Sequence, residues 1–187
     1  MPDDEVSVAT CDLALAELMV ADGDVTRGAA VAAALEELRA DRKAEGDLVD
    51  VAKVDILRGR LLLEAEPAAA RQLFDDAMTV ARACADNETA AEAEMRKGFA
   101  LVRLGDVAAG VRTLRRGRRV LERHHRADLV VEGRLFLMRT FAAAGDDEAA
   151  KREARILHRL LEHSGHRRLL GEVVRVRGVP RPPAPAA

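Results

Sequence analysis

The sequence predicts an all-α protein, and three observations lead to that prediction. Only 2% of the 187 residues are aromatic, whereas 49% are hydrophobic and 33% are charged. A core of Ala, Leu, Val and Met favours helices that pack on helices, because strands depend on aromatic and β-branched side chains. Apolar residues also recur at helical spacing, and Gly-Asp steps interrupt them at nearly equal intervals along much of the chain.

The Gly-Asp steps are predicted to end one helix and begin the next. They occur at Gly23-Asp24, Gly105-Asp106 and Gly145-Asp146, and Ala65-Glu66 followed by Pro67 takes the corresponding place in between. Gly suits the residue after a helix C-cap, where φ is positive, and Asp accepts hydrogen bonds from the free N–H groups of the next helix. Pro67 suits the first position of a helix.

Two kinds of helix alternate around these steps. The segments 8–20, 51–63, 90–104 and 129–143 are apolar on most sides, as expected for helices with neighbours on both faces. The segments that follow the last two steps place their apolar residues on one face, which indicates amphipathic helices. Those residues are Val107, Val111, Leu114 and Leu121 after Gly105-Asp106, and Ala150, Ala154, Leu157 and Leu161 after Gly145-Asp146.

The helices are expected to form antiparallel hairpins in a single domain. The polar links 42–47, 85–89 and 123–128 are short, so each helix must turn back on the one before it. A chain of this length suits one domain, which we expect over 1–177, with a short C-terminal segment after the last hairpin. The Pro-rich tail 178–187 is expected to be disordered. The four hairpins are predicted at about 7–44, 47–85, 88–125 and 127–164.

Small and large residues recur at matching positions of these hairpins. Ala70 and Phe74 have the spacing A-x3-F, and the pairs Gly28/Ala32, Gly98/Leu101, Gly110/Leu114, Leu137/Phe141 and Ala150/Ala154 occupy related positions. This pattern, over 7–163, resembles the tetratricopeptide repeat, although the Trp and the final Pro of that family are missing. The repeat of about 40 residues is also longer than the family's period of about 34 residues. The resemblance implies a right-handed superhelix, or α-solenoid, whose concave surface holds another protein.

By analogy with that family, the first helix of each hairpin is expected to line a partner-binding groove. Such a groove, with an apolar floor and an acidic margin, suits a protein segment that carries apolar anchors beside Lys or Arg. The alternative is that Met95, Phe99 and Leu135 belong to the ordinary core between helices. The expected groove residues are Leu13, Glu17, Asp55, Leu62, Glu92, Met95, Phe99, Val102, Leu135 and Arg139.

Charge is distributed unevenly along the chain. Residues 1–94 hold 22 acidic and 9 basic residues, whereas residues 95–187 hold 10 acidic and 21 basic residues. Within the basic half, five arginines at helical spacing are predicted to form a stripe on one helix face, opposite its apolar residues. This basic stripe comprises Arg112, Arg115, Arg116, Arg119 and Arg123.

The stripe leaves several interpretations open. It can be a solvated helix face, as surface charge often is. It can dock an acidic protein, or the acidic half of a second copy of this chain, which would make the protein a self-associating structural module. It can also bind nucleic acid or another polyanion over 112–126, but no aromatic residues lie among the arginines to stack on bases, which argues against nucleic acid.

The sequence predicts no enzymatic activity, cofactor or metal. No phosphate-binding glycine motif is present, and neither of the two serines lies in a nucleophile motif. His158 and Glu162 share a helix face, but the arginines around them oppose a cation. Cys11 and Cys84 are expected to be small core residues. An acidic N-terminus and the lack of an apolar run of about 18 residues predict a cytoplasmic protein without membrane contact. The expected role is therefore that of a protein-binding scaffold or adaptor.

Overall fold

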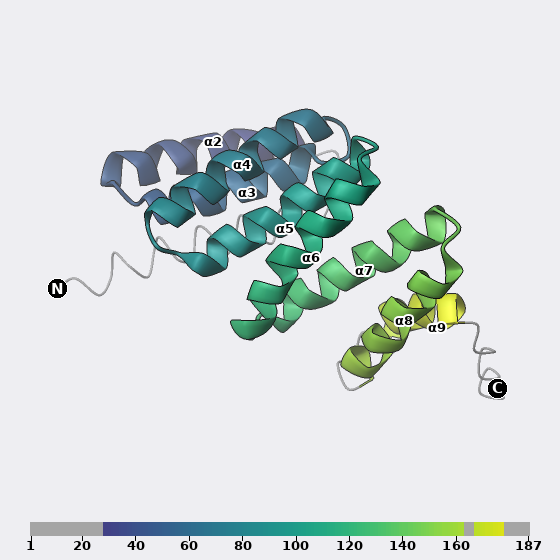
Figure 1. The fold of residues 1–187 in the computed structure, drawn as a ribbon. Helices are drawn as coiled ribbons and strands as arrows, with labels where there is room; N and C mark the ends of the chain where they lie inside the picture. Colours follow the sequence, from purple (N-terminus) through teal and green to yellow (C-terminus); the bar gives the residue numbers. More distant parts are fainter. Residues whose placement is uncertain (1–27, 163–166, 178–187) are drawn as a thin grey trace, which may run out of the picture. The chain divides into compact units, whose positions relative to one another are not determined.

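The described residues of the computed structural model, 28–162 and 167–177, form helices joined by short turns, without a strand (Figure 1). This confirms the all-α class. The predicted helix 8–20 and the tail 178–187 lie outside the described residues. The eight described helices are α2 (Gly28–Glu45), α3 (Leu48–Leu62), α4 (Pro67–Ala83), α5 (Asn87–Arg103), α6 (Val107–Arg123), α7 (Ala127–Ala143), α8 (Asp147–Leu161) and α9 (Arg167–Arg177).

The helices begin at a regular interval that is half of the sequence repeat. The starts of helices α4 to α8 are evenly spaced along the chain, at residues 67, 87, 107, 127 and 147, and we call this spacing the helix interval. Helices α4 to α7 contain 17 residues each, which leaves three residues for each connection. A connection this short forces adjacent helices to run in opposite directions when they pack together. The sequence repeat therefore corresponds to a pair of helices.

Most of the connections share one backbone conformation, whichever residue type is present. Ala85 and His125 have φ values of 59° and 58°, in the same region as Gly105 at 91° and Gly145 at 75°. The sequence predicts a left-handed residue at a helix end from the presence of glycine. The segments 85–89 and 123–128 lack glycine, so they are expected to be ordinary links. The backbone shows that these links end their helices in the same way, by one residue in the left-handed region.

Aspartates after the left-handed residue cap the helices that follow. Asp86, Asp106 and Asp146 each donate a backbone N–H to a carbonyl in the last turn of the preceding helix, at 2.9–3.0 Å. Their side chains accept from N–H groups in the first turn of the next helix, for example from Ala109 at 3.0 Å for Asp106. One residue therefore satisfies free backbone groups of two helices.

The described helices divide into two compact units, with the boundary between His124 and His125. In the first unit, each helix from α2 to α6 packs on the next, and α3 also contacts α5. In the second unit, α7 packs on α8 and α8 on α9. Successive packing of this kind is compatible with a helical repeat fold. The single domain over 1–177 that the sequence predicts stays a prediction.

Helices α5 and α6 approach each other more closely than ordinary side chains would allow. A Cβ built on Gly98 would lie 2.8 Å from the carbonyl oxygen of Gly110 and 2.6 Å from the nitrogen of Leu114. A Cβ built on Gly117 would lie 2.5 Å from the carbonyl oxygen of Ala91. The two backbones are therefore in contact, and this contact fixes the position of α6 on α5.

Replacing Ala85 with Gly is expected to stabilise the first unit by about 1 kcal/mol, because an L-residue pays a steric cost at positive φ that Gly avoids. Urea unfolding followed by circular dichroism measures the change. Ala83→Gly is the matched control, since Ala83 is exposed in the last turn of α4. It should destabilise by about 0.5–1 kcal/mol. Equal effects of the two changes would contradict the assigned conformation.

Replacing Gly117 with Ala is expected to lower the free energy of unfolding by about 1–3 kcal/mol, since the new methyl group would collide with the backbone of α5. Gly171→Ala in α9 is the control, because a Cβ at Gly171 meets no atom within 4 Å. That change should be neutral or stabilising. A Gly117→Ala protein as stable as the wild type would show that α5 and α6 are not in backbone contact.

Candidate functional site

The groove residues predicted in the first helices have different environments. Leu13 and Glu17 lie outside the described residues. Met95, Phe99 and Leu135 are buried, with exposed fractions of 0%, 2% and 9%. These three side chains are therefore core residues, the alternative that the sequence leaves open, and they present no surface to a partner in this packing.

Asp55, also predicted to line the groove, is buried in an ion-pair network between α2 and α3. Its Oδ1 lies 2.7 Å from Nε of Arg39 and 2.8 Å from a terminal nitrogen of Arg58. The hydrogen bond to Asp55 is the main cause that raises the pKa of Arg39 above its ordinary value, although burial of Arg39 acts in the opposite direction. Asp55 therefore links two helices.

The remaining groove residues do not form one surface within a single unit. Leu62 and Val102 are half-buried, and Arg139 is exposed. Glu92 is half-buried and pairs with Arg96 at 3.1 Å. Leu135 and Arg139 belong to the second unit, whereas the other described groove residues belong to the first.

The basic stripe, in contrast, lies entirely on the surface of one helix. All five of its arginines on α6 are exposed, and Val111, Leu114 and Leu121 are buried on the other side of the helix. Helix α6 contains six arginines and one glutamate. That glutamate, Glu122, pairs with the sixth arginine, Arg118, which is buried and lies outside the stripe.

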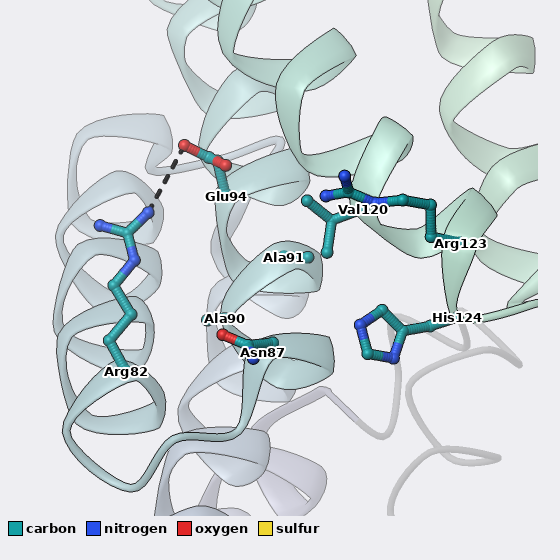
Figure 2. Close-up of a pocket in the computed structure, with 8 residues that line it drawn as sticks. All are labelled: Arg82, Asn87, Ala90, Ala91, Glu94, Val120, Arg123 and His124. Carbon is teal, nitrogen blue, oxygen red and sulfur yellow. Dashed lines mark ion pairs between the residues drawn. The ribbon is translucent and has the colours of Figure 1, made fainter.

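A pocket of about 520 Å³ lies beside the end of the stripe, between α4, α5 and α6. Figure 2 shows Arg82 of α4 on one side of it, Arg123 and His124 at the end of α6 on the other, and α5 in between. Small residues of α5 make this space, since alanine leaves room that a longer side chain would fill. The lining residues are Arg82, Asn87, Ala90, Ala91, Glu94, Val120, Arg123 and His124.

Glu94 is a buried carboxylate at one end of this pocket. Its side chain is 5% exposed, and it pairs with Arg116 of the stripe and with Arg82 at 3.7 Å (Figure 2). Phe74 and Leu114, one helix interval before and after it in sequence, are both fully buried core residues. Glu94 therefore places a charge where the neighbouring repeats have an apolar side chain.

The first turn of α5, which forms the wall of the pocket at Asn87, is held by Asp86. The Asp86 carboxylate accepts hydrogen bonds from the N–H of Glu88 and from the N–H and hydroxyl of Thr89. Burial by itself raises the pKa of Asp86, but these hydrogen bonds and nearby Lys53 outweigh burial and lower it below its ordinary value. Its contribution to stability is therefore present above the unfolded-state pKa and is lost as the pH falls through the folded-state pKa.

The sequence pattern does not mark Arg82, Asn87, Glu94 and His124 as residues of one pocket. A comparison of positions one helix interval apart would have identified Glu94, because it reveals an acid between Phe74 and Leu114. The sequence-based prediction that Cys84 is a core residue is wrong, because Cys84 is the exposed C-cap of α4. Cys11 lies outside the described residues.

Within residues 28–162 and 167–177, no three His, Cys, Asp or Glu side chains gather in a way that could hold a metal ion. The described helices also include none with the length and apolar character needed to cross a bilayer.

Comparison with known protein families finds no family model that matches the chain, and comparison with curated proteins finds no matching sequence. The likeness to the tetratricopeptide repeat therefore depends on the residue pattern, together with the successive packing of the helices.

Replacing Glu94 with Leu is expected to leave the free energy of unfolding unchanged or to raise it by about 1 kcal/mol, because a buried carboxylate with its arginines is often less favourable than a packed apolar side chain. The double change Arg82→Leu and Arg116→Leu should instead destabilise by about 2 kcal/mol or more, since it leaves Glu94 buried without these partners. Urea unfolding checks both values. A large loss in Glu94→Leu would show that the carboxylate is needed for folding.

Proposed function

We propose that this protein is a non-enzymatic interaction module that binds an acidic segment of another protein along the exposed face of α6. The observation that carries the proposal is the basic stripe, five exposed arginines on one helix face. From Arg112 to Arg123 the stripe extends over about 16 Å of helix. Closely spaced arginines favour a partner with carboxylates, because guanidinium and carboxylate groups form charge-assisted hydrogen bonds.

The face of α6 supports binding better than the predicted groove does. Three apolar anchors of that groove, Met95, Phe99 and Leu135, are buried. The arginines of α6, in contrast, can contact a partner without any change in helix packing. The proposal therefore keeps the predicted role of a scaffold or adaptor and places its contact surface on the second helix of a pair.

The pocket beside the stripe supports an acidic partner with an additional side-chain contact. Arg123 belongs to both the stripe and the pocket lining, so the two surfaces are continuous. Ala90, Ala91 and Val120 give the pocket an apolar part, and Arg82 and His124 add polar groups at its rim. The pairing of Arg116 with the Glu94 carboxylate is an example, within the chain, of the contact proposed for the partner.

A second copy of this chain is the alternative partner that the sequence favours. Residues 1–26 contain seven acidic residues and no basic residue, so they are complementary in charge to the stripe. Binding of this kind would produce salt-dependent self-association. Light scattering of the full chain from low to high salt separates the alternatives, because a mass that stays monomeric leaves a different protein as the partner.

The proposal predicts that the combined change Arg112→Gln, Arg115→Gln and Arg119→Gln weakens binding of a fluorescent oligo-glutamate peptide to the face of α6 about tenfold at low salt. The reason is that each exposed charge pair contributes up to about 1 kcal/mol. Fluorescence anisotropy measures the affinity, and binding of the wild type should decrease as salt is added.

The control carries Lys43→Gln, Arg71→Gln and Arg175→Gln, which remove the same charge from exposed positions on other helices. It should bind like the wild type. Equal losses in both variants would indicate attraction by net charge alone and would contradict a specific surface on α6. Tighter binding of duplex DNA than of the peptide, with the same dependence on the three arginines, would assign the stripe to nucleic acid instead.

A further inference from the structure

The arginines of α6 recur at the corresponding positions of α8. A shift by two helix intervals, from the start of α6 to the start of α8, places Arg112, Arg115 and Arg119 on Arg152, Arg155 and Arg159. In α4, one helix pair earlier, the corresponding residues are Gln72, Asp75 and Thr79. A general excess of arginine in the chain would not restrict the triplet to these two helices, so the recurrence indicates a common role for the two helix faces.

The second triplet is exposed in the structure. Arg152, Arg155 and Arg159 are exposed, and together with Ile156 they line a hollow of about 400 Å³ on α8. The buried face of α8 contains apolar side chains that pack in the second unit, among them Ala150, Ala154, Leu157 and Leu161. The triplet therefore lies on the outer face of its helix, as the stripe lies on the outer face of α6.

The acidic residues of α8 do not neutralise this triplet. Glu153 is buried and pairs with Arg134 of α7 at 2.9 Å, and Glu148 in the first turn pairs with Lys151. Glu162, at the end of the helix, pairs with His158. Among the described residues, no acidic side chain forms an ion pair with Arg152, Arg155 or Arg159. The positive charge of this face is therefore available to a ligand.

We propose that the outer face of α8 is a second docking surface, and that the protein binds a partner with two acidic segments, one on α6 and one on α8. The inference rests on the proposed function of α6 and extends it by naming the form of the partner. Each surface lies within one compact unit, so each can bind whatever the arrangement of the two units.

Two linked contacts increase affinity without any new kind of interaction. Once one acidic segment is bound, the linker holds the other at a high effective concentration near the second surface. A gain of ten- to a hundredfold over a single segment is a modest value for such linkage. Two weak, salt-sensitive contacts can together give firm binding to the correct partner, while a protein with one acidic segment dissociates quickly.

The partner chemistry favoured by these contacts is a carboxylate-rich polypeptide. The partly buried Ile156 between the arginines of α8 gives an apolar contact that a peptide side chain can use. Each unit already contains an arginine that pairs with a glutamate across helices: Arg116 pairs with Glu94, and Arg134 pairs with Glu153.

The test uses the full chain and two labelled probes, a single oligo-glutamate block and two such blocks joined by a flexible Gly-Ser linker. Four proteins are compared: the wild type, the α6 triple variant, an α8 variant with Arg152→Gln, Arg155→Gln and Arg159→Gln, and the control with Lys43→Gln, Arg71→Gln and Arg175→Gln. Circular dichroism spectra and thermal melts confirm that each variant keeps its helices.

We expect the wild type and the control to bind two single blocks per chain, and each triple variant to bind one. The two-block probe should bind the wild type at least tenfold more tightly than it binds either variant. An α8 variant that keeps wild-type stoichiometry and two-block affinity would overturn the second surface, while loss in the α6 variant alone would leave the proposed function intact.

The remaining outcomes are also decisive. If the α6 and α8 variants both bind like the wild type, the proposed function and the second surface both fail. If two single blocks bind but the linked probe gains nothing at any linker length, the two surfaces exist and the bivalent partner is excluded. Binding of linked DNA duplexes in preference to linked peptides would replace the acidic protein with nucleic acid.

Discussion

The packing of the described helices depends on how each of them ends. In most connections one residue with positive φ ends the helix, and where the next residue is Asp86, Asp106 or Asp146 it caps the following helix. Because so short a connection allows little separation, successive helices within each compact unit pack on one another. Contacts then occur mainly between neighbours in sequence, as in other repeat proteins.

The sequence predicts the helices well because the stop and start residues have clear chemical preferences. The predicted helical segments 51–63, 90–104 and 129–143 overlap closely with α3, α5 and α7. The helix interval is not evident from the sequence, because Ala85 and His125 occupy positions where glycine is the usual residue. Their positive φ is a property of the backbone at the helix ends, which residue type alone does not reveal.

The site is harder to predict than the fold, since exposure depends on the relative rotation of the helices. The exposed face of α6 follows from its strong separation of arginines and apolar residues. Met95 and Phe99 lie on α5, which is buried along most of its length, and apolar spacing does not distinguish a groove from a contact between helices. The pocket depends on the small size of Ala90 and Ala91, so it becomes visible only when three helices are in place.

The helix interval also limits how a chain of this kind can change its length. Within one compact unit, loss or duplication of a single helix with its connection would reverse the direction of the helices that follow. Only the addition or loss of two helices at a time preserves the direction of the helices that follow. This accounts for a sequence pattern that recurs at every second helix, although a helix begins at every helix interval. In evolution, a chain of this kind would therefore grow by whole helix pairs.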